Sequence, residues 1–158
     1  MCPPGAYVIG DGRQDDCGFA AKTLLQHTSA THVLCPQYRL ASNPGGRFPS
    51  QLQDAITSFL YLIEELKVPA SQITISGDSA GGNLCLALLR YIADNLKAAV
   101  PSPGCAFLWS PWVDPVFHPM SLQCFGFRKQ ILLIMGSGGI SRRRLPRQVA
   151  QCANRLPC

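Results

Sequence analysis

The chain has 158 residues, of which 47% are hydrophobic and 15% charged, with a formal net charge of +5. This length and composition suit one globular domain with a buried core and exclude a disordered polypeptide. Apolar stretches fall well short of the ~20 residues that span a bilayer, so we expect no membrane span. The N-terminus lacks the basic and apolar segments of a signal peptide, and we expect a cytoplasmic protein.

The first third of the chain predicts a helix, a strand and a loop, in that order. Apolar residues at helical spacing after two acidic residues predict a helix over 15–27, and the apolar run after it predicts a buried strand over 31–37. Residues 38–46 are rich in turn formers and predict a loop. Within that loop, we interpret Arg39 as a structural ion-pair or hydrogen-bond anchor.

The clearest helix follows this loop. Ser50 and Gln53 have the spacing of a capping box, and apolar residues then recur at helical spacing as far as Leu66. The sequence therefore predicts a helix that begins at a capped Ser50 and presents one apolar face to the core.

Strands and helices alternate in the central part of the chain. Residues 72–76 predict a strand, residues 80–96 a helix and residues 104–110 a second buried strand. Such alternation is typical of an α/β fold, and it predicts a parallel sheet with helices on both faces.

The alternation stops near Met120. Residues 1–120 contain seven basic and nine acidic residues, whereas residues 121–158 contain seven basic residues and no acidic one. We therefore predict one α/β domain over 1–120 and a poorly ordered basic tail over 121–158, in which residues 131–135 have the composition of one strand. Three adjacent arginines, 142–144, are too weak a signal to predict nucleic-acid binding.

Eight cysteines are present, without a C-x-x-C pair or the spacing of a zinc finger. Several lie in apolar runs, where cysteine behaves as a small hydrophobic residue. We interpret them as free thiols in a reducing compartment, and we predict no metal site and no other cofactor.

The pentapeptide Gly77-Asp78-Ser79-Ala80-Gly81 joins the 72–76 strand to the 80–96 helix. In a G-x-S-x-G turn of this kind, small neighbours permit a strained serine whose hydroxyl projects from the sheet. Ser79 is therefore the candidate nucleophile, and an ordinary turn rich in small residues is the alternative. Asp78 suits the positive end of the helix dipole, so we give it a structural role.

The residues 77–84, together with 38–40, Phe48-Pro49 and 110–112, resemble the hormone-sensitive-lipase-like branch of the α/β-hydrolases, the fold-3 family. The resemblance covers roughly residues 4–115. It implies a partial α/β-hydrolase fold and a carboxylic ester hydrolase that acts by serine acyl transfer on a small-molecule ester.

In that family, an H-G-G-G or H-G-G-A segment supplies amides to the oxyanion hole. The matching stretch here is 3–7, in which Pro3 and Pro4 replace the histidine and the first glycine. Gly5 and Ala6 keep their N–H groups, so the resemblance implies an oxyanion hole made by Gly5, Ala6 and Ala80.

The family's triad aspartate and histidine follow the nucleophile by about a hundred residues or more. Only 79 residues follow Ser79, and Asp94, Asp114 and His118 come too early to be that acid and base. A serine hydroxyl without an adjacent base is a weak nucleophile, so we expect impaired activity. His118, four residues after Asp114, is the alternative base in a makeshift dyad with Ser79.

The sequence leaves the activity open. The chain is either an impaired esterase, or a catalytically inactive remnant or ligand-binding module with the same fold. Binding of nucleic acid through the basic tail is a third class, which we do not expect. The sequence leaves the oligomeric state open.

Overall fold

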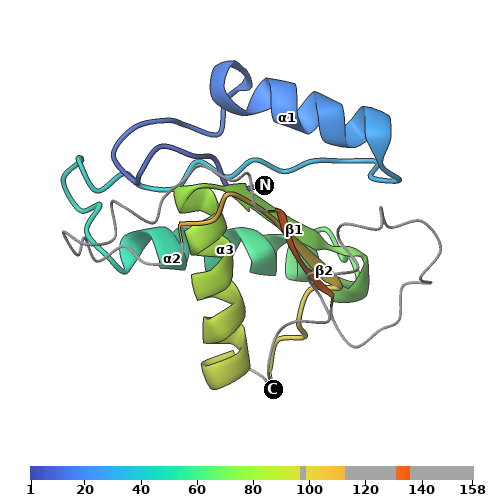
Figure 1. Cartoon of the computed structure of the whole chain (residues 1–158). Helices are drawn as coiled ribbons and strands as arrows, with labels where there is room; N and C mark the ends of the chain where they lie inside the picture. Colours follow the sequence, from blue (N-terminus) through green and yellow to red (C-terminus); the bar gives the residue numbers. More distant parts are fainter. Residues whose placement is uncertain (97–98, 113–130, 136–158) are drawn as a thin grey trace.

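A computed structural model of the chain describes residues 1–96, 99–112 and 131–135 (Figure 1). Its helices and strands follow one another in the order that the central sequence predicts. They are α1 (Gln14–His27), α2 (Ser50–Leu60) with a π-helical continuation η1 (Tyr61–Glu65), η2 (Ala70–Gln72), β1 (Thr74–Asp78), α3 (Ala80–Tyr91) with a π-helical continuation η3 (Ile92–Leu96), β2 (Cys105–Trp109) and β3 (Ile131–Met135).

The described strands form one sheet in the order β1-β2-β3. β1 and β2 are parallel, with Thr74 opposite Cys105 and Asp78 opposite Trp109, and α3 connects them. This β1-α3-β2 unit confirms the predicted α/β fold. The strand at 131–135 is also confirmed, but it pairs with β2 in the antiparallel direction. An apolar run indicates a strand without indicating its direction, so the sequence did not reveal this antiparallel edge.

The core lies between the sheet and two helices. α3 packs on β1 and β2, and α2 packs beside α3. The side chains that α2 and α3 bury recur at helical spacing, as the sequence predicts. They are Leu52, Ala55 and Phe59 from α2 and Ala80, Leu84, Cys85 and Leu88 from α3.

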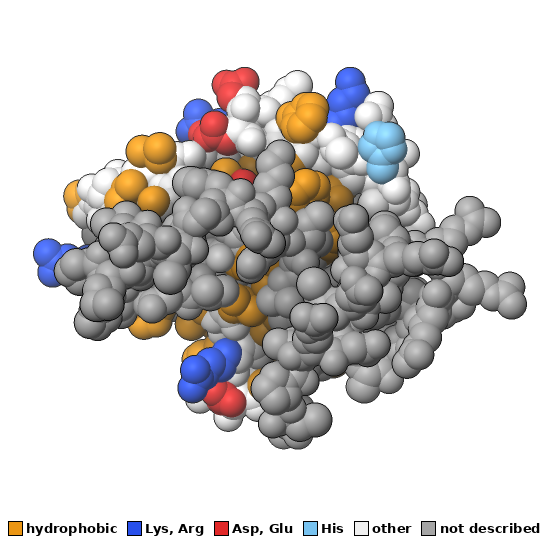
Figure 2. Space-filling model, in the orientation of Figure 1, with side chains coloured by type: hydrophobic (Ala, Val, Ile, Leu, Met, Phe, Trp, Pro, Cys, Tyr) orange, Lys and Arg blue, Asp and Glu red, His pale blue; other side chains and the backbone are white. Residues whose placement is uncertain are grey.

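Helix α1 confirms the helix predicted over 15–27, but it lies apart from α2 and α3, on the other side of the N-terminal segment (Figure 1). Cys17 is its one buried residue. Phe19 is 85% exposed, and Figure 2 shows apolar side chains standing among charged ones at the surface. α1 therefore contributes little to the core.

The strand predicted over 31–37 is wrong. These residues form neither helix nor strand, and most of their side chains are exposed. The N-terminal ammonium of Met1 donates a hydrogen bond of 2.6 Å to the carbonyl of Leu34, as the first bond of a strand pair between residues 1–4 and 31–37 would. Pro3 and Pro4 follow on the same segment, and proline has no N–H to continue such a ladder.

The capping box at Ser50 is also wrong. The helix begins at Ser50, but its N-cap is Pro49 rather than Ser50, and no side chain caps it. Proline has no N–H, so the side chain of Gln53 has no backbone donor at the cap to accept from. The Ser50 hydroxyl instead donates to the carbonyl of Gly45 at 2.7 Å.

Arg39 is the structural anchor that the sequence predicts. Its guanidinium binds Asp54 on α2 through both Nε and Nη2, at 3.0 Å and 2.9 Å, and its backbone N–H donates to the same carboxylate at 2.8 Å. Burial alone would raise the pKa of Asp54, but these hydrogen bonds hold it below its ordinary value. The pair ties the loop at 38–46 to α2.

Two expectations lie largely outside the described residues. Apart from β3, the structure does not describe the predicted basic tail over 121–158, so the domain boundary near residue 120 stays a prediction. In the part of the chain that the structure describes, no helix has the length and apolar character needed to cross a membrane.

We expect Leu108→Ala to lower the free energy of unfolding by about 2–5 kcal/mol, because Leu108 on β2 is fully buried and its truncation leaves a cavity. The matched control is Leu66→Ala, at a side chain that is 52% exposed, for which we expect a change of about 0.5 kcal/mol. Urea unfolding followed by tryptophan fluorescence measures both. Equal losses would contradict the placement of β2 in the core.

Candidate active site

Ser79 stands alone between β1, which ends at Asp78, and α3, which begins at Ala80. Its backbone has φ 53° and ψ −114°, a conformation that L-residues rarely adopt. Three backbone hydrogen bonds hold it there. The Ser79 N–H donates to Trp109 at 3.0 Å, and the Ser79 carbonyl accepts from Asn83 at 3.1 Å and from Trp112 at 3.0 Å. The strain therefore persists because the surroundings fix the backbone on both sides.

The glycines of the pentapeptide are required by close backbone contacts. A Cβ on Gly77 would lie 2.2 Å from the carbonyl oxygen of Gly81, and a Cβ on Gly81 would lie 2.2 Å from the carbonyl oxygen of Cys2. Real Cβ atoms do not approach other atoms so closely. The turn therefore depends on small residues at both positions, as a nucleophile elbow does.

The loop at residues 3–9, which we call the N-terminal loop, has an unusual backbone. Gly5, Ala6 and Tyr7 all have positive φ angles, of 128°, 52° and 65°. The carbonyl of Gly5 accepts from Val8 and Ile9, at 3.0 Å each. The backbone hydrogen bonds described outside the helices and strands include none donated by the amides of Gly5, Ala6 or Ala80.

Contacts at both ends bring the N-terminal loop to the elbow. Before the loop, Cys2 forms a parallel bridge with Gly77, and its N–H donates to the carbonyl of Ser76 at 2.6 Å. Within the loop, the Tyr7 hydroxyl donates to Oδ1 of Asn83, in the first turn of α3, at 2.7 Å. The structure thus brings the stretch that contains Gly5 and Ala6 alongside Ser79 and Ala80.

Three residues support this arrangement that the sequence analysis did not identify as site residues: Tyr7, Tyr38 and Asn83. Asn83 accepts from Tyr7 and also donates through Nδ2 to the carbonyl of Trp112 at 2.7 Å. Tyr38 donates to the carbonyl of Pro3 at 2.8 Å, and its ring lies 6.0 Å from that of Tyr7. A polar residue in the first turn after the serine was the available signal. Burial raises the pKa of both tyrosines, so their hydroxyls remain protonated donors.

Backbone strain gathers around the elbow. Among the described residues, five that are not glycine have positive φ, and only Lys67 lies away from the elbow and the segments beside it. The other four are Ala6, Tyr7, Ser79 and Ser110. Each such residue costs about 1–3 kcal/mol, and residues of this kind cluster where a structure must hold groups in a set position for function.

The described acidic and histidine side chains do not complete a triad. Asp94 lies in η3, about 20 Å along the helix from Ser79 at 1.5 Å per residue, and pairs with Arg90 at 3.3 Å. His27 ends α1, and His32 is exposed and hydrogen-bonded to Thr31. Asp114 and His118 lie outside the described residues.

Asp78 adjoins the serine as the last residue of β1. Burial raises its pKa, and a hydrogen bond with the Ser79 backbone opposes this rise. In residues 1–96 and 99–112, no three His, Cys, Asp or Glu side chains are grouped so that they could hold a metal ion.

The geometry of strand, strained serine and helix has a counterpart in known proteins. Residues 4–135 match the alpha/beta hydrolase fold family. The chain belongs to this family. This α/β-hydrolase is 31% identical over 110 residues to an acetyl-hydrolase of Streptomyces hygroscopicus, which covers 70% of the chain and 34% of that protein. It is 32% identical over 103 residues to an ethyl acetate hydrolase of Pseudomonas putida, covering 61% of the chain and 30% of the relative.

Solved structures agree with this assignment. An esterase/lipase from an uncultured bacterium superimposes with a TM-score of 0.60 at 30% identity, covering 72% of the chain and 36% of the relative. A hormone-sensitive lipase from a metagenome library gives a TM-score of 0.57 at 28% identity, covering 72% and 35%. The resemblance to the hormone-sensitive-lipase-like branch is confirmed. The chain spans about a third of the length of the acetyl-hydrolase and the ethyl acetate hydrolase that it matches.

We expect Gly81→Ala to lower the free energy of unfolding by about 3 kcal/mol or more, because the new Cβ would meet backbone atoms of Cys2 that cannot move aside. Gly45→Ala is the matched control, since Gly45 has φ 76° but nothing within 4 Å of the new Cβ, and we expect a loss of about 1 kcal/mol. Urea unfolding compares the two. A smaller loss for Gly81→Ala than for Gly45→Ala would show that the segment around Cys2 does not lie against the elbow.

We expect Tyr7→Phe to destabilise the protein by about 1–2 kcal/mol, because it removes the hydroxyl that donates to Asn83 and leaves that side-chain oxygen without this donor. Tyr61→Phe is the control, at a tyrosine that is 47% exposed, and we expect no measurable change. Thermal unfolding of the two variants in parallel makes the comparison, and equal melting temperatures would contradict a structural role for the Tyr7 hydroxyl.

Proposed function

We propose that this chain carries the nucleophile and the oxyanion hole of a carboxylic ester hydrolase. The observation that supports this most strongly is the strained backbone of Ser79, with φ 53°, held by hydrogen bonds at the end of β1. A serine at this place, with its side chain half-buried rather than packed in the core, suits attack on a bound carbonyl.

In the proposed reaction, the Ser79 hydroxyl attacks the ester carbonyl and forms a tetrahedral intermediate. The amides of Gly5, Ala6 and Ala80 stabilise the negative oxygen of this intermediate. The alcohol then leaves, and water hydrolyses the acyl-enzyme to release the acid. Among the backbone hydrogen bonds described outside the helices and strands, none is donated by these three amides. An oxyanion hole needs amides that can donate to the substrate.

We propose small-molecule esters with short acyl groups as the substrate class. Support comes from the relatives, which include an acetyl-hydrolase and an ethyl acetate hydrolase. The chemistry needs no metal or other cofactor, because the serine and the backbone amides supply the nucleophile and the charge stabilisation.

We propose that the activity of this chain is impaired. The described residues supply a nucleophile and amide donors, but their two histidines lie away from Ser79. An enzyme that loses triad members retains about 10³–10⁴-fold catalysis over water from its oxyanion hole and binding alone. The same observation favours a second candidate function, an inactive relative that binds ligands through the same fold.

A cytoplasmic location is part of the proposal. The cysteines that the structure describes are all free thiols, which supports a reducing compartment.

We expect the purified chain to hydrolyse p-nitrophenyl acetate slowly, at no more than about 10³–10⁴ times the rate in water, and we expect Ser79→Ala to lower this rate, because acyl transfer needs the serine hydroxyl. The matched control is Ser29→Ala, which removes an exposed hydroxyl from the loop after α1. A rate equal to that of Ser79→Ala would favour the inactive binding module.

His118→Ala distinguishes the two possible sources of any activity. A loss equal to that of Ser79→Ala would identify His118 as the base of a dyad, whereas an unchanged rate would mean that Ser79 acts without His118.

A further inference from the structure

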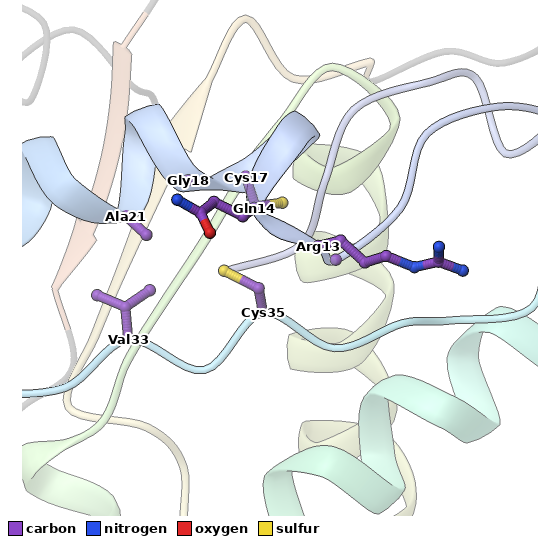
Figure 3. A pocket seen from close by; sticks show the side chains of 8 residues that line it. Arg13, Gln14, Cys17, Gly18, Ala21, Val33 and Cys35 are labelled. Carbon is purple, nitrogen blue, oxygen red and sulfur yellow. The ribbon is translucent and has the colours of Figure 1, made fainter.

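Helix α1 meets the rest of the chain across a small cavity of about 260 Å³, between α1 and the segment at 33–35 (Figure 3). Two of the residues that line it are cysteines, Cys17 from α1 and Cys35 from the opposite segment. Neither belongs to the elbow or the N-terminal loop, and the proposed ester hydrolysis uses neither.

Cys17 and Cys35 face the same cavity from its two sides. Cys17 is 1% exposed, and its thiol donates to the carbonyl of Asp11 at 3.3 Å and interacts with the side chain of Cys35. Figure 3 shows the Cys35 sulfur directed toward α1 and the Cys17 sulfur beside the first turn of that helix. A disulfide bond, which is about 2.05 Å long, requires the Cys17 side chain to rotate away from Asp11 toward Cys35.

The backbone around this pair is closely packed. A Cβ on Gly12 would lie 2.6 Å from the carbonyl oxygen of Cys35, so the turn before α1 lies directly on the 35–36 backbone. The Gly12 N–H also donates to Oε1 of Gln37 at 2.8 Å. These contacts hold the turn before α1 against the backbone of Cys35, so the two cysteines stay on the two sides of one cavity.

We propose that Cys17 and Cys35 form a reversible disulfide with a low-molecular-weight disulfide of the glutathione class as the oxidant. Cys35 is half-exposed, so its thiolate attacks glutathione disulfide, forms a mixed disulfide and releases one glutathione. The thiolate of Cys17 then attacks the Cys35 sulfur, forms the protein disulfide and releases the second glutathione. The two protein thiol protons pass to the two released glutathione thiolates.

The second step is the slow one. Burial and the neighbouring Cys35 raise the pKa of Cys17 to about 12, so little of it is thiolate near neutral pH. The rate of ring closure therefore increases with pH across the neutral and alkaline range.

A second thiol pair provides an internal comparison. Cys2 and Cys85 both belong to the hydrophobic core, where they are only 7% and 0% exposed. Glutathione disulfide cannot reach them in the folded protein. The difference in exposure makes Cys17–Cys35 the pair that reacts and Cys2–Cys85 the pair that stays reduced.

The disulfide fastens a weakly attached helix. Cys17 is the one buried residue of α1, so little apolar surface holds the helix in place. A covalent bond to Cys35 closes a loop of roughly 18 residues and restricts the unfolded chain, and we expect it to raise the melting temperature by roughly 5–10 °C.

The test incubates the folded full chain with glutathione disulfide, blocks the remaining thiols with N-ethylmaleimide in acid and maps tryptic peptides by mass spectrometry. Trypsin places Cys17 in peptide 14–22 and Cys35 in peptide 23–39, separate from each other and from the other cysteines. We expect these two peptides linked as the main product, and the peptides of Cys2 and Cys85 alkylated. The linked product disappears when dithiothreitol is added.

Unfolding and substitution supply the controls. In concentrated urea we expect links scattered among the eight cysteines, since the native arrangement is lost. Cys35→Ala removes the rise in melting temperature on oxidation, whereas Cys105→Ala, at another half-buried thiol, retains it. Glutathione retained on Cys35 beside an alkylated Cys17, or Cys35 linked to another cysteine, would overturn the proposal. None of these outcomes depends on ester hydrolysis.

Discussion

The backbone of Ser79 is the constraint on which the rest of the site depends. A residue at φ 53° and ψ −114° relaxes unless its neighbours hold it, and here the ends of β2 and α3 do so. Trp109 accepts from the serine N–H, and Trp112 and Asn83 donate to its carbonyl. The parallel pairing of β1 with β2 therefore does more than fill the core. It places the carbonyl of Trp109 where it accepts from Ser79 and keeps the serine in its unusual conformation.

The N-terminal loop is held by a different set of interactions. Its two prolines prevent a continuous ladder with the segment at 31–37, so a single bridge at Cys2 and two tyrosine hydroxyls take the place of strand pairing. The close approach of Gly81 to Cys2 makes this contact possible. As a result, the loop is positioned by the same first turn of α3 that positions the serine, and the two parts of the site share one support.

The sequence was informative where a feature is local, and much less so where it depends on distant neighbours. The elbow, α3, β1 and β2 follow from adjacent residues, and their positions agree with the structure. The 31–37 strand failed because a strand needs a partner with free donors, and Pro3 and Pro4 supply none. The bond between Tyr7 and Asn83 joins residues 76 apart, and neither residue alone indicates the other. The Arg39 anchor was recognised, but not its partner Asp54.

The elbow and the catalytic base are physically separate requirements. Ser79 is held by backbone hydrogen bonds and by close packing of glycines, and neither of these interactions involves an imidazole or a triad carboxylate. A chain can therefore retain the complete geometry of the nucleophile while its hydroxyl remains a weak nucleophile. It follows that membership of the α/β-hydrolase family and rapid turnover are independent properties of this chain. The fold depends on the packing of the sheet and helices, whereas the rate depends on whether a proton acceptor reaches the Ser79 hydroxyl.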